Sequence, residues 1–161
     1  MLPCAGGARA SIAPVAADPK LATRHGLVQK TFMQRLLLVC VAGAVGTGLR
    51  YIVGLGCARA LGGAFPYGTL VVNVAGCFLM AAVMQAATDA ALVPETARVA
   101  LTSGLMGGLT TYSAFNFEST RLSDQRAWSL FALNVLGTLV LCFVAGHLGA
   151  WIARRMLAPS A

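Results

Sequence analysis

The chain has few acidic residues and few charges of any kind. Of its 161 residues, five are Asp or Glu, twelve are Lys or Arg, and 11% in all are charged. A water-soluble domain carries about a quarter charged residues, so this chain has too few to cover a water-facing surface. Since 58% of the residues are hydrophobic, the composition indicates a single integral membrane domain.

The chain also lacks the groups that most enzymes and metal proteins use. None of its five cysteines forms a C-x-x-C pair, and its two histidines do not cluster with them, so metal-ligand spacing is absent. The apolar runs contain no pair of carboxylates for acid–base work and no serine with an evident histidine partner. No glycine-rich phosphate loop follows a strand. We therefore expect that the protein is not an enzyme.

The net charge of +7 raises the question of a nucleic-acid partner. Neither a basic face nor a recognition motif accompanies the charge. Most basic residues lie outside the apolar runs, as expected for residues that hold helices at an anionic membrane surface. We therefore expect a lipid bilayer and no nucleic acid as the partner of these charges.

The first 32 residues differ from the rest of the chain. They contain three prolines and no helical apolar period, and their apolar stretch is too short and broken for a signal peptide. We expect residues 1–32 to form a flexible tail. An alternative is a protein that starts at Met33, because MQRLLLVCVAGAVG is typical of the beginning of a membrane protein.

Residues 33–158 contain four apolar stretches, each with roughly the 20 residues that a helix needs to cross a bilayer. Lipid offers no partners to free backbone groups, so each stretch is expected to be helical. The expected spans run over about residues 35–55, 66–88, 98–117 and 128–153. The fold class is therefore an all-α membrane protein with four transmembrane helices.

The basic residues give little preference for one orientation in the membrane. Without the tail, one side has five (Lys30, Arg35, Arg98, Arg154 and Arg155) and the other has four (Arg50, Arg59, Arg121 and Arg126). Such a small positive-inside bias allows insertion both ways and suggests an antiparallel dimer. A single, weakly biased topology is an alternative. Arg9, Lys20 and Arg24 would make the count eight against four.

A few polar residues lie at membrane depth and need partners there. Asn73, well inside the second span, predicts either a hydrogen bond to another helix or a donor that lines a pore. Asn134 and Thr138 are one turn apart and share a face of the fourth span. Arg50 either extends to the interface or gives positive potential to a vestibule.

The third span contains the sequence GGLTTYSAF over residues 107–115. Two glycines followed by two threonines weaken a helix, which predicts a break in the middle of the membrane. Broken backbone at that depth is tolerated only inside protein or along an aqueous cavity. Its freed carbonyls suit Na⁺ or K⁺. Tyr112 and Phe115 would share a face, and the positive edge of an aromatic ring attracts a small anion. The alternative is an aromatic pair that only packs.

Three segments, GAVGTGLRY, PYGTLVVNVAGCF and GGLTTYSAFNFE, together resemble the Fluc (CrcB) fluoride channels of microbes. They occur in the order of that family, and the resemblance covers about residues 33–155. It implies four transmembrane helices, the third broken, in an antiparallel dual-topology homodimer. It also implies passive export of fluoride across the bacterial inner (plasma) membrane, which relieves fluoride toxicity.

The resemblance further implies roles for particular residues. The rings of Tyr112 and Phe115 would line the fluoride path, Asn73 would donate to the ion, and Arg50 would lie near the vestibule. Three hydroxyls would continue the polar path, those of Thr111, Ser113 and Thr138. Backbone carbonyls at Gly107 and Thr110 would hold a structural Na⁺ at the dimer centre.

The sequence departs from the family pattern at two positions, Tyr112 in place of the usual Phe and Ala114 where Thr or Ser is frequent. Two other function classes stay open. A proton-coupled small multidrug exporter would need a carboxylate in the membrane, and Glu118 lies only at the end of the third span. A non-transporting membrane assembly subunit would use the small-residue faces for packing alone.

Overall fold

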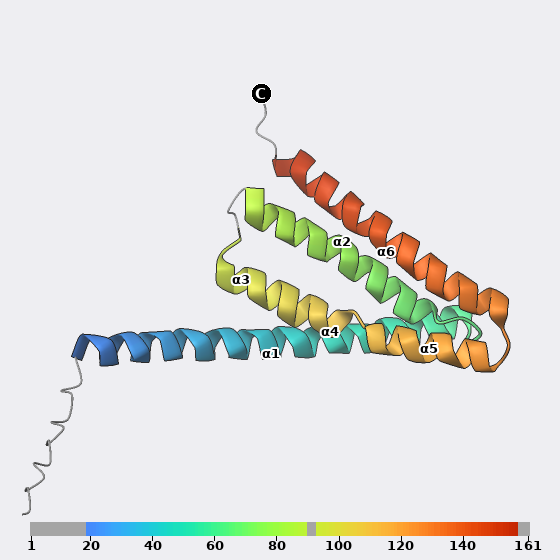
Figure 1. Ribbon diagram of the computed structural model, residues 1–161, viewed down its shortest axis with the longest axis horizontal. Helices are drawn as coiled ribbons and strands as arrows, with labels where there is room; N and C mark the ends of the chain where they lie inside the picture. Colours follow the sequence, from blue (N-terminus) through green and yellow to red (C-terminus); the bar gives the residue numbers. More distant parts are fainter. Residues whose placement is uncertain (1–18, 90–92, 158–161) are drawn as a thin grey trace, which may run out of the picture. The chain divides into compact units, whose positions relative to one another are not determined.

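A computed structural model of the chain describes residues 19–89 and 93–157, with side chains from residue 29 onward, and this described part is helical without strands (Figure 1). The chain divides into two compact units, residues 1–32 and residues 33–161. Three of the described helices are long and apolar enough to cross a membrane, over Gln29–Leu61, Tyr67–Thr88 and Trp128–Leu157. The protein is therefore an all-α, multi-pass membrane protein.

The first helix, α1 (Pro19–Leu61), begins earlier than expected. Proline is tolerated at the first position of a helix, where its missing N–H has no partner anyway. No further proline follows until Pro66, so the helix can extend upstream from the apolar run. Residues 19–32, which were expected to belong to a flexible tail, are thus helical in the structure, and residues 1–18 lie outside the described residues. At the other end, Gly62 has a left-handed φ of 80° and its N–H donates to the Ala58 carbonyl (3.1 Å), which ends the helix.

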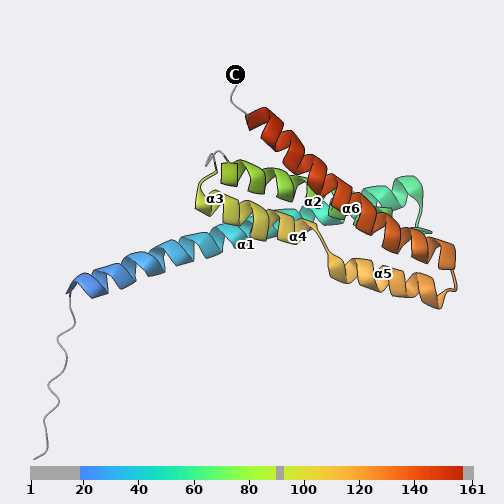
Figure 2. The same cartoon turned by 45° about the horizontal axis from the view of Figure 1, so that its top comes forward.

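Helices α2 (Tyr67–Asp89) and α6 (Trp128–Leu157) lie side by side (Figures 1 and 2). Their backbones approach closely because glycine stands at the contact. A Cβ atom on Gly149 would collide with the carbonyl oxygen of Phe78. Small residues at helix contacts are expected in lipid, where packing drives association.

The expected third span is a series of shorter helices. Helix α3 (Glu95–Val99), the π-helix η1 (Ala100–Met106) and α4 (Gly107–Leu109) follow one another, and α5 (Tyr112–Asp124) comes after Thr110 and Thr111. The π-helix was not predicted. Within it, the Thr102 hydroxyl donates to the Arg98 carbonyl (2.8 Å), a bond of the kind that perturbs an α-helical ladder.

Helix α1 packs against η1 and α4 through glycines on both sides. A Cβ atom on Gly46 would collide with the Leu105 carbonyl, and one on Gly108 would collide with the Gly43 carbonyl. Helix α1 also contacts α3, because Arg35 pairs with Glu95 through two hydrogen bonds of 3.2 Å. Both side chains of that pair are exposed, so it contributes little stability in water.

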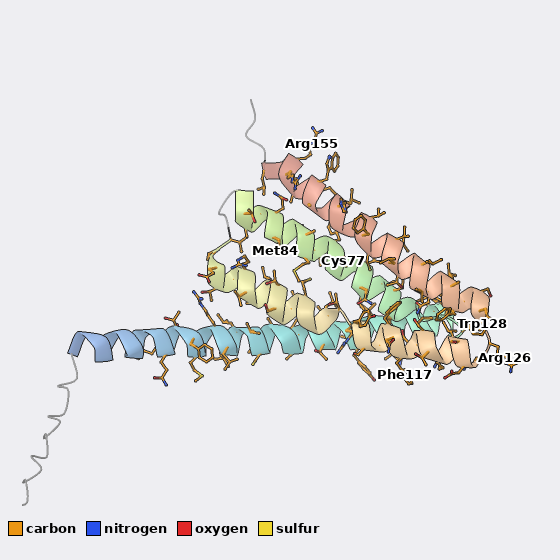
Figure 3. The ribbon with its side chains drawn as sticks, viewed as in Figure 1. Cys77, Met84, Phe117, Arg126, Trp128 and Arg155 are labelled. Carbon is orange, nitrogen blue, oxygen red and sulfur yellow. The ribbon has the colours of Figure 1, made fainter. Side chains whose placement is uncertain are left out.

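The side chains fall into a small core and a broad apolar exterior. Val72, Met106 and Leu109 form the buried core cluster. Large apolar side chains such as Phe117 and Trp128 extend outward (Figure 3) and are 68% and 59% exposed. In a membrane protein such side chains meet lipid or another chain instead of water.

Candidate functional site

The helical run is interrupted at Thr110 and Thr111, the centre of GGLTTYSAF. Thr110 has φ −84° and ψ 156°, and Thr111 has φ −153° and ψ 117°, both extended. In a continuous helix the Thr111 N–H would donate to the Gly107 carbonyl and the Ala114 N–H to the Thr110 carbonyl. Here the Thr111 N–H donates to Asn73 Oδ1 (2.8 Å), and the Ala114 N–H donates to Thr111 Oγ1 (3.1 Å). Because these two N–H groups donate to the side chains of Asn73 and Thr111, they no longer donate to the carbonyls of Gly107 and Thr110.

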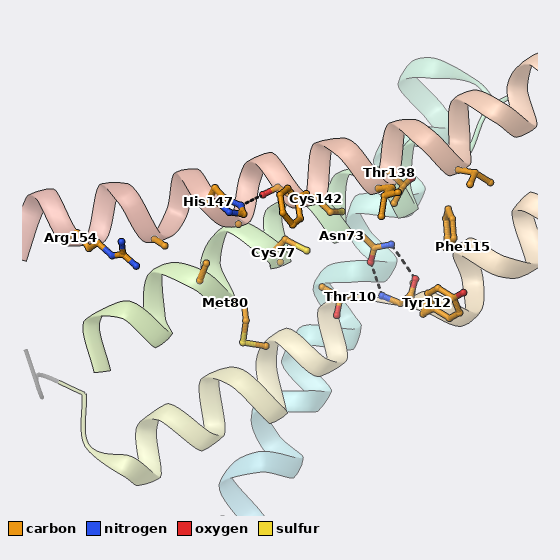
Figure 4. Close-up of a pocket in the computed structure, with 18 residues that line it drawn as sticks. Asn73, Cys77, Met80, Thr110, Tyr112, Phe115, Thr138, Cys142, His147 and Arg154 are labelled. Carbon is orange, nitrogen blue, oxygen red and sulfur yellow. Dashed lines mark hydrogen bonds between the residues drawn. The ribbon is translucent and has the colours of Figure 1, made fainter. Parts of the chain in front are cut away.

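Asn73 holds the interruption in place from α2. Besides accepting from the Thr111 N–H, its Nδ2 donates to the Thr111 carbonyl (3.1 Å), so the amide satisfies both backbone groups of one residue (Figure 4). The side chain is 9% exposed. The hydrogen bond between helices that the sequence analysis considered for Asn73 is therefore present. A side-chain amide has two N–H donors, so the second one does not take part in this pair.

Thr111 starts α5 as its N-cap. Its hydroxyl accepts from the Ala114 N–H and lies 3.1 Å from the Ser113 hydroxyl. This cap replaces one of the hydrogen bonds that the first turn of a helix cannot make internally. The helix therefore resumes immediately after the interruption, with Tyr112 as its first residue.

The resumed helix places two aromatic rings together. The ring centroids of Tyr112 and Phe115 are 5.7 Å apart, with 45° between the planes. Tyr112 is 80% exposed, whereas Phe115 is half-buried. In such a tilted pair, the edge of each ring carries positive potential and its face carries negative potential.

A groove of about 940 Å³ lies between α2, the interruption and α6 (Figure 4). One end of it is lined by Asn73, Thr111, Tyr112 and Phe115. We call this the groove throughout. Helix α2 contributes Asn73, Gly76, Cys77, Met80 and Ala81; the interrupted segment contributes Thr110, Thr111, Tyr112 and Phe115; and α6 contributes Val135, Thr138, Leu139, Cys142, Phe143, Gly146, His147, Ala150 and Arg154.

The groove brings together most of the predicted site residues. Asn73, Thr111, Tyr112, Phe115 and Thr138 all line it, as does Thr110. Thr138 Oγ1 is buried and has no hydrogen-bond partner within the described residues. A buried hydroxyl of this kind is available to a bound ion or water.

Three predicted residues do not line the groove. Ser113 is exposed and reaches only the Thr111 hydroxyl. Arg50 is half-buried on α1, and Gly107 is exposed on α4. The structure therefore brings neither Arg50 nor Ser113 to the groove wall.

The sequence analysis missed several lining residues on α6 and α2. The sequence pattern singled out none of Cys77, Cys142 and His147, and it marked Arg154 only as one of the basic residues that flank the spans. Spacing could have found the α6 residues, because Thr138, Cys142, Gly146, Ala150 and Arg154 recur every four positions and so follow one helical face. His147 Nδ1 is paired with the Phe143 carbonyl (2.9 Å) one turn earlier.

A second set of polar bonds ties α5 to its neighbours. Thr69 on α2 donates to Glu118 Oε1 (2.9 Å), and Asn134 on α6 donates to the Ser119 hydroxyl (2.9 Å). Asn134 is fully buried. These bonds fix the orientation of α5, which carries Tyr112 and Phe115.

Apolar membrane-crossing helices around a groove with polar groups and ring edges define a membrane protein of the channel or transporter class. The family described as "CrcB-like protein, Camphor Resistance (CrcB)" matches residues 37–150. The chain belongs to this family.

Several relatives are similar over nearly their whole length. A protein of Sorangium cellulosum (strain So ce56) named "Fluoride-specific ion channel FluC" is 44% identical over 126 residues, which cover 78% of this chain and 99% of that one. Proteins of the same name are 45% identical in Anaeromyxobacter sp. (strain K), over 76% of this chain and 97% of the relative, and 46% identical in Anaeromyxobacter dehalogenans, over 75% and 99%.

Proposed function

We propose that this protein is a passive, fluoride-selective ion channel of the bacterial plasma membrane that exports fluoride and so relieves its toxicity. The observation that carries the proposal is the similarity to relatives named fluoride-specific ion channels over 97–99% of their length. The matched region contains the whole groove except Arg154. The family is one of ion channels, so the protein is a channel and not an enzyme.

The chemistry of the groove supports this function. Fluoride is a small anion that accepts strong hydrogen bonds and needs replacements for its water. The second N–H of Asn73, the hydroxyls of Thr111 and Thr138, and the ring edges of Tyr112 and Phe115 offer donors and positive potential without a fixed positive charge. A path built this way stabilises a dehydrated anion without binding it too tightly to leave.

We also propose that α3 through α5 together make a further membrane crossing, the third in chain order, broken at Thr110 and Thr111. The first half of α5 contains Tyr112, Phe115 and Phe117, and Phe117 is 68% exposed. The hydrogen bonds from Asn73 satisfy both backbone groups of Thr111, and pairing of this kind is what irregular backbone inside a membrane needs.

A structural Na⁺ at this break is part of the proposal. Carbonyl oxygens are hard ligands that suit Na⁺, and those of Gly107 and Thr110 have lost their helical donors to side chains. The chain's own residues thus fit a cation at the break. The positive charge of this cation would help to bind two chains together. Thermal unfolding in NaCl and in N-methylglucamine chloride tests this: we expect a lower midpoint without Na⁺, and equal midpoints contradict the site.

The partner at this site is proposed to be a second, antiparallel copy of the chain. Two observations support it: the balanced basic residues on the two sides of the membrane, and the exposure of Gly107 and Tyr112 beside the break. Protease digestion of a C-terminal tag on intact vesicles tests the orientation. Cleavage of about half the tags from either side supports dual topology, and cleavage from one side alone contradicts it.

Purified protein in liposomes tests the function itself. Vesicles loaded with KF or KCl are diluted into impermeant salt, and valinomycin lets K⁺ leave with the anion, so that no opposing membrane potential builds up. A fluoride electrode should record rapid efflux from the KF vesicles, while a chloride electrode records little from the KCl vesicles. Equal rates for the two anions, or no fluoride efflux, contradict the proposal.

A further inference from the structure

Two thiols lie together on the wall of the groove. Cys77 on α2 and Cys142 on α6 interact through their side chains, and both line the groove (Figure 4). They can meet despite their short side chains because the helix backbones are close here. A Cβ atom on Gly146, one turn beyond Cys142, would lie 3.9 Å from the Cys77 carbonyl oxygen.

Both cysteines are free thiols and only half-buried, so a small ion in the groove can reach them. The thioether of Met80, one turn after Cys77 on α2, also lines the groove. Sulfur ligands select soft cations over the hard cations that oxygen ligands prefer. The wall of the groove thus presents a soft donor pair in a passage that is otherwise suited to a hard anion.

The number of ligands narrows the class of cation. Within the described residues, no group of three or more His, Cys, Asp or Glu side chains is placed to hold a metal. Structural Zn²⁺ takes four such ligands, so it is a poor fit. Soft ions that accept two sulfur ligands, such as Hg²⁺ and Ag⁺, match a pair of neighbouring thiols that two helices contribute to one groove.

We propose that Cys77 and Cys142 form a binding site for a soft, two-coordinate metal ion, and that the bound ion closes the groove. Binding of Hg²⁺ forms two S–Hg bonds and releases the two thiol protons to water, with no change in oxidation state. Figure 4 places these cysteines between Asn73, Thr138 and Phe115 on one side and His147 and Arg154 on the other. An ion held there interrupts the groove midway, so the block of fluoride flux rests on the proposed function.

Metal binding is tested first, without reference to transport. The full-length protein receives Hg²⁺, is alkylated with maleimide, and is digested for peptide mass spectrometry. We expect Hg²⁺ to protect Cys77 and Cys142 at concentrations that leave Cys40 on α1 reactive. Native mass spectrometry of a C4S/C40S/C57S variant should show one Hg²⁺ per chain, with two protons lost. Equal protection of all cysteines, or no mercury adduct on this variant, overturns the site.

Removing either thiol is the second test. In the same background, C77S or C142S should weaken Hg²⁺ binding by roughly a hundredfold or more, because the second ligand of a two-ligand site binds within the same molecule. Unchanged affinity overturns the proposal. The peptide-protection measurement uses unsubstituted protein, so it tells whether Cys77 and Cys142 bind Hg²⁺ even if a variant fails to fold.

Fluoride efflux then tests closure. Hg²⁺ should stop efflux from vesicles with the C4S/C40S/C57S protein and leave efflux through its C77S derivative unaffected. Mercury bound to both thiols with undiminished efflux overturns closure. Absence of efflux before any metal is added would instead contradict the proposed function, so the two failures are distinguishable.

Discussion

Asn73 and Thr111 exchange two hydrogen bonds, in which one side-chain amide pairs with both the N–H and the carbonyl of one residue (2.8 and 3.1 Å). The amide acts here as a neighbouring backbone segment acts in a sheet. It pairs both backbone groups of Thr111, one of the two residues of extended backbone between the helical segments. The interruption in the third span therefore depends on a residue of the second.

Replacing Asn73 tests this dependence. N73A leaves the N–H and the carbonyl of Thr111 without partners, and an unpaired buried group costs about 1–3 kcal/mol. We expect a lower free energy of unfolding and faster hydrogen exchange at the Thr111 amide. Asn116, exposed on α5, provides the matched control, because N116A should change stability by at most about 0.5 kcal/mol. Similar losses in the two variants would contradict the role of the Asn73 amide.

The N-cap of α5 gives a second prediction. T111V removes the hydroxyl that accepts from the Ala114 N–H while keeping the shape of the side chain, and loss of a cap costs about 1 kcal/mol. T111S retains the hydroxyl and should unfold near the midpoint of the unsubstituted protein. Thermal unfolding in detergent measures both. A T111V protein as stable as T111S would show that the cap contributes nothing.

The packing of α1 against η1 and α4 predicts that adding one methyl group to a glycine of α1 has an effect that depends on the position of that glycine. G46A places a Cβ against the Leu105 carbonyl, whereas a Cβ on Gly48, two residues further, meets nothing within 4 Å. Overpacking typically costs about 1–3 kcal/mol, so G46A should be destabilised. G48A should be neutral or more stable, since alanine favours a helix over glycine by about 1 kcal/mol. Equal unfolding midpoints would contradict the close packing.

The aromatic residues of α5 separate transport from packing. F115I removes the ring that lines the groove, while F117I removes a ring that is 68% exposed and does not line it. We expect F115I to lose most fluoride efflux in liposomes while its elution from size exclusion stays unchanged. F117I should retain efflux. If F115I conducted normally, the ring would have a packing role only.

The sequence predicts the long apolar helices well because their length and composition are set by the thickness of a bilayer. The expected bounds 66–88 and 128–153 lie within four residues of those of α2 and α6. It predicts the irregular backbone at Thr110 and Thr111 as well, since two glycines and two threonines weaken a helix locally. It does not predict the start of α1 at Pro19, because proline marks a helix start and a break equally.

The candidate site was only partly predictable. Asn73, Tyr112 and Phe115 stand out because polar or aromatic residues beside a break need partners. Cys77 and Cys142 do not stand out, since a cysteine in an apolar run looks like any small residue until the packing of α2 on α6 pairs the two. Arg50 was placed near the vestibule from a resemblance; it lies on α1 and does not line the groove, and its role at a vestibule stays a prediction.

The π-helix at Ala100–Met106 bears on how this segment tolerates changes in length. A π-helix uses hydrogen bonds from i to i+5 and so contains more residues per turn than an α-helix. A chain shortened by one residue between 100 and 106 could close into regular α-helix and still present Gly108 to α1. A chain lengthened there would need a ladder wider than the one that the π-helix already has. We therefore expect that, among single-residue insertions and deletions in the third span, a deletion between residues 100 and 106 is the change that still allows the protein to fold.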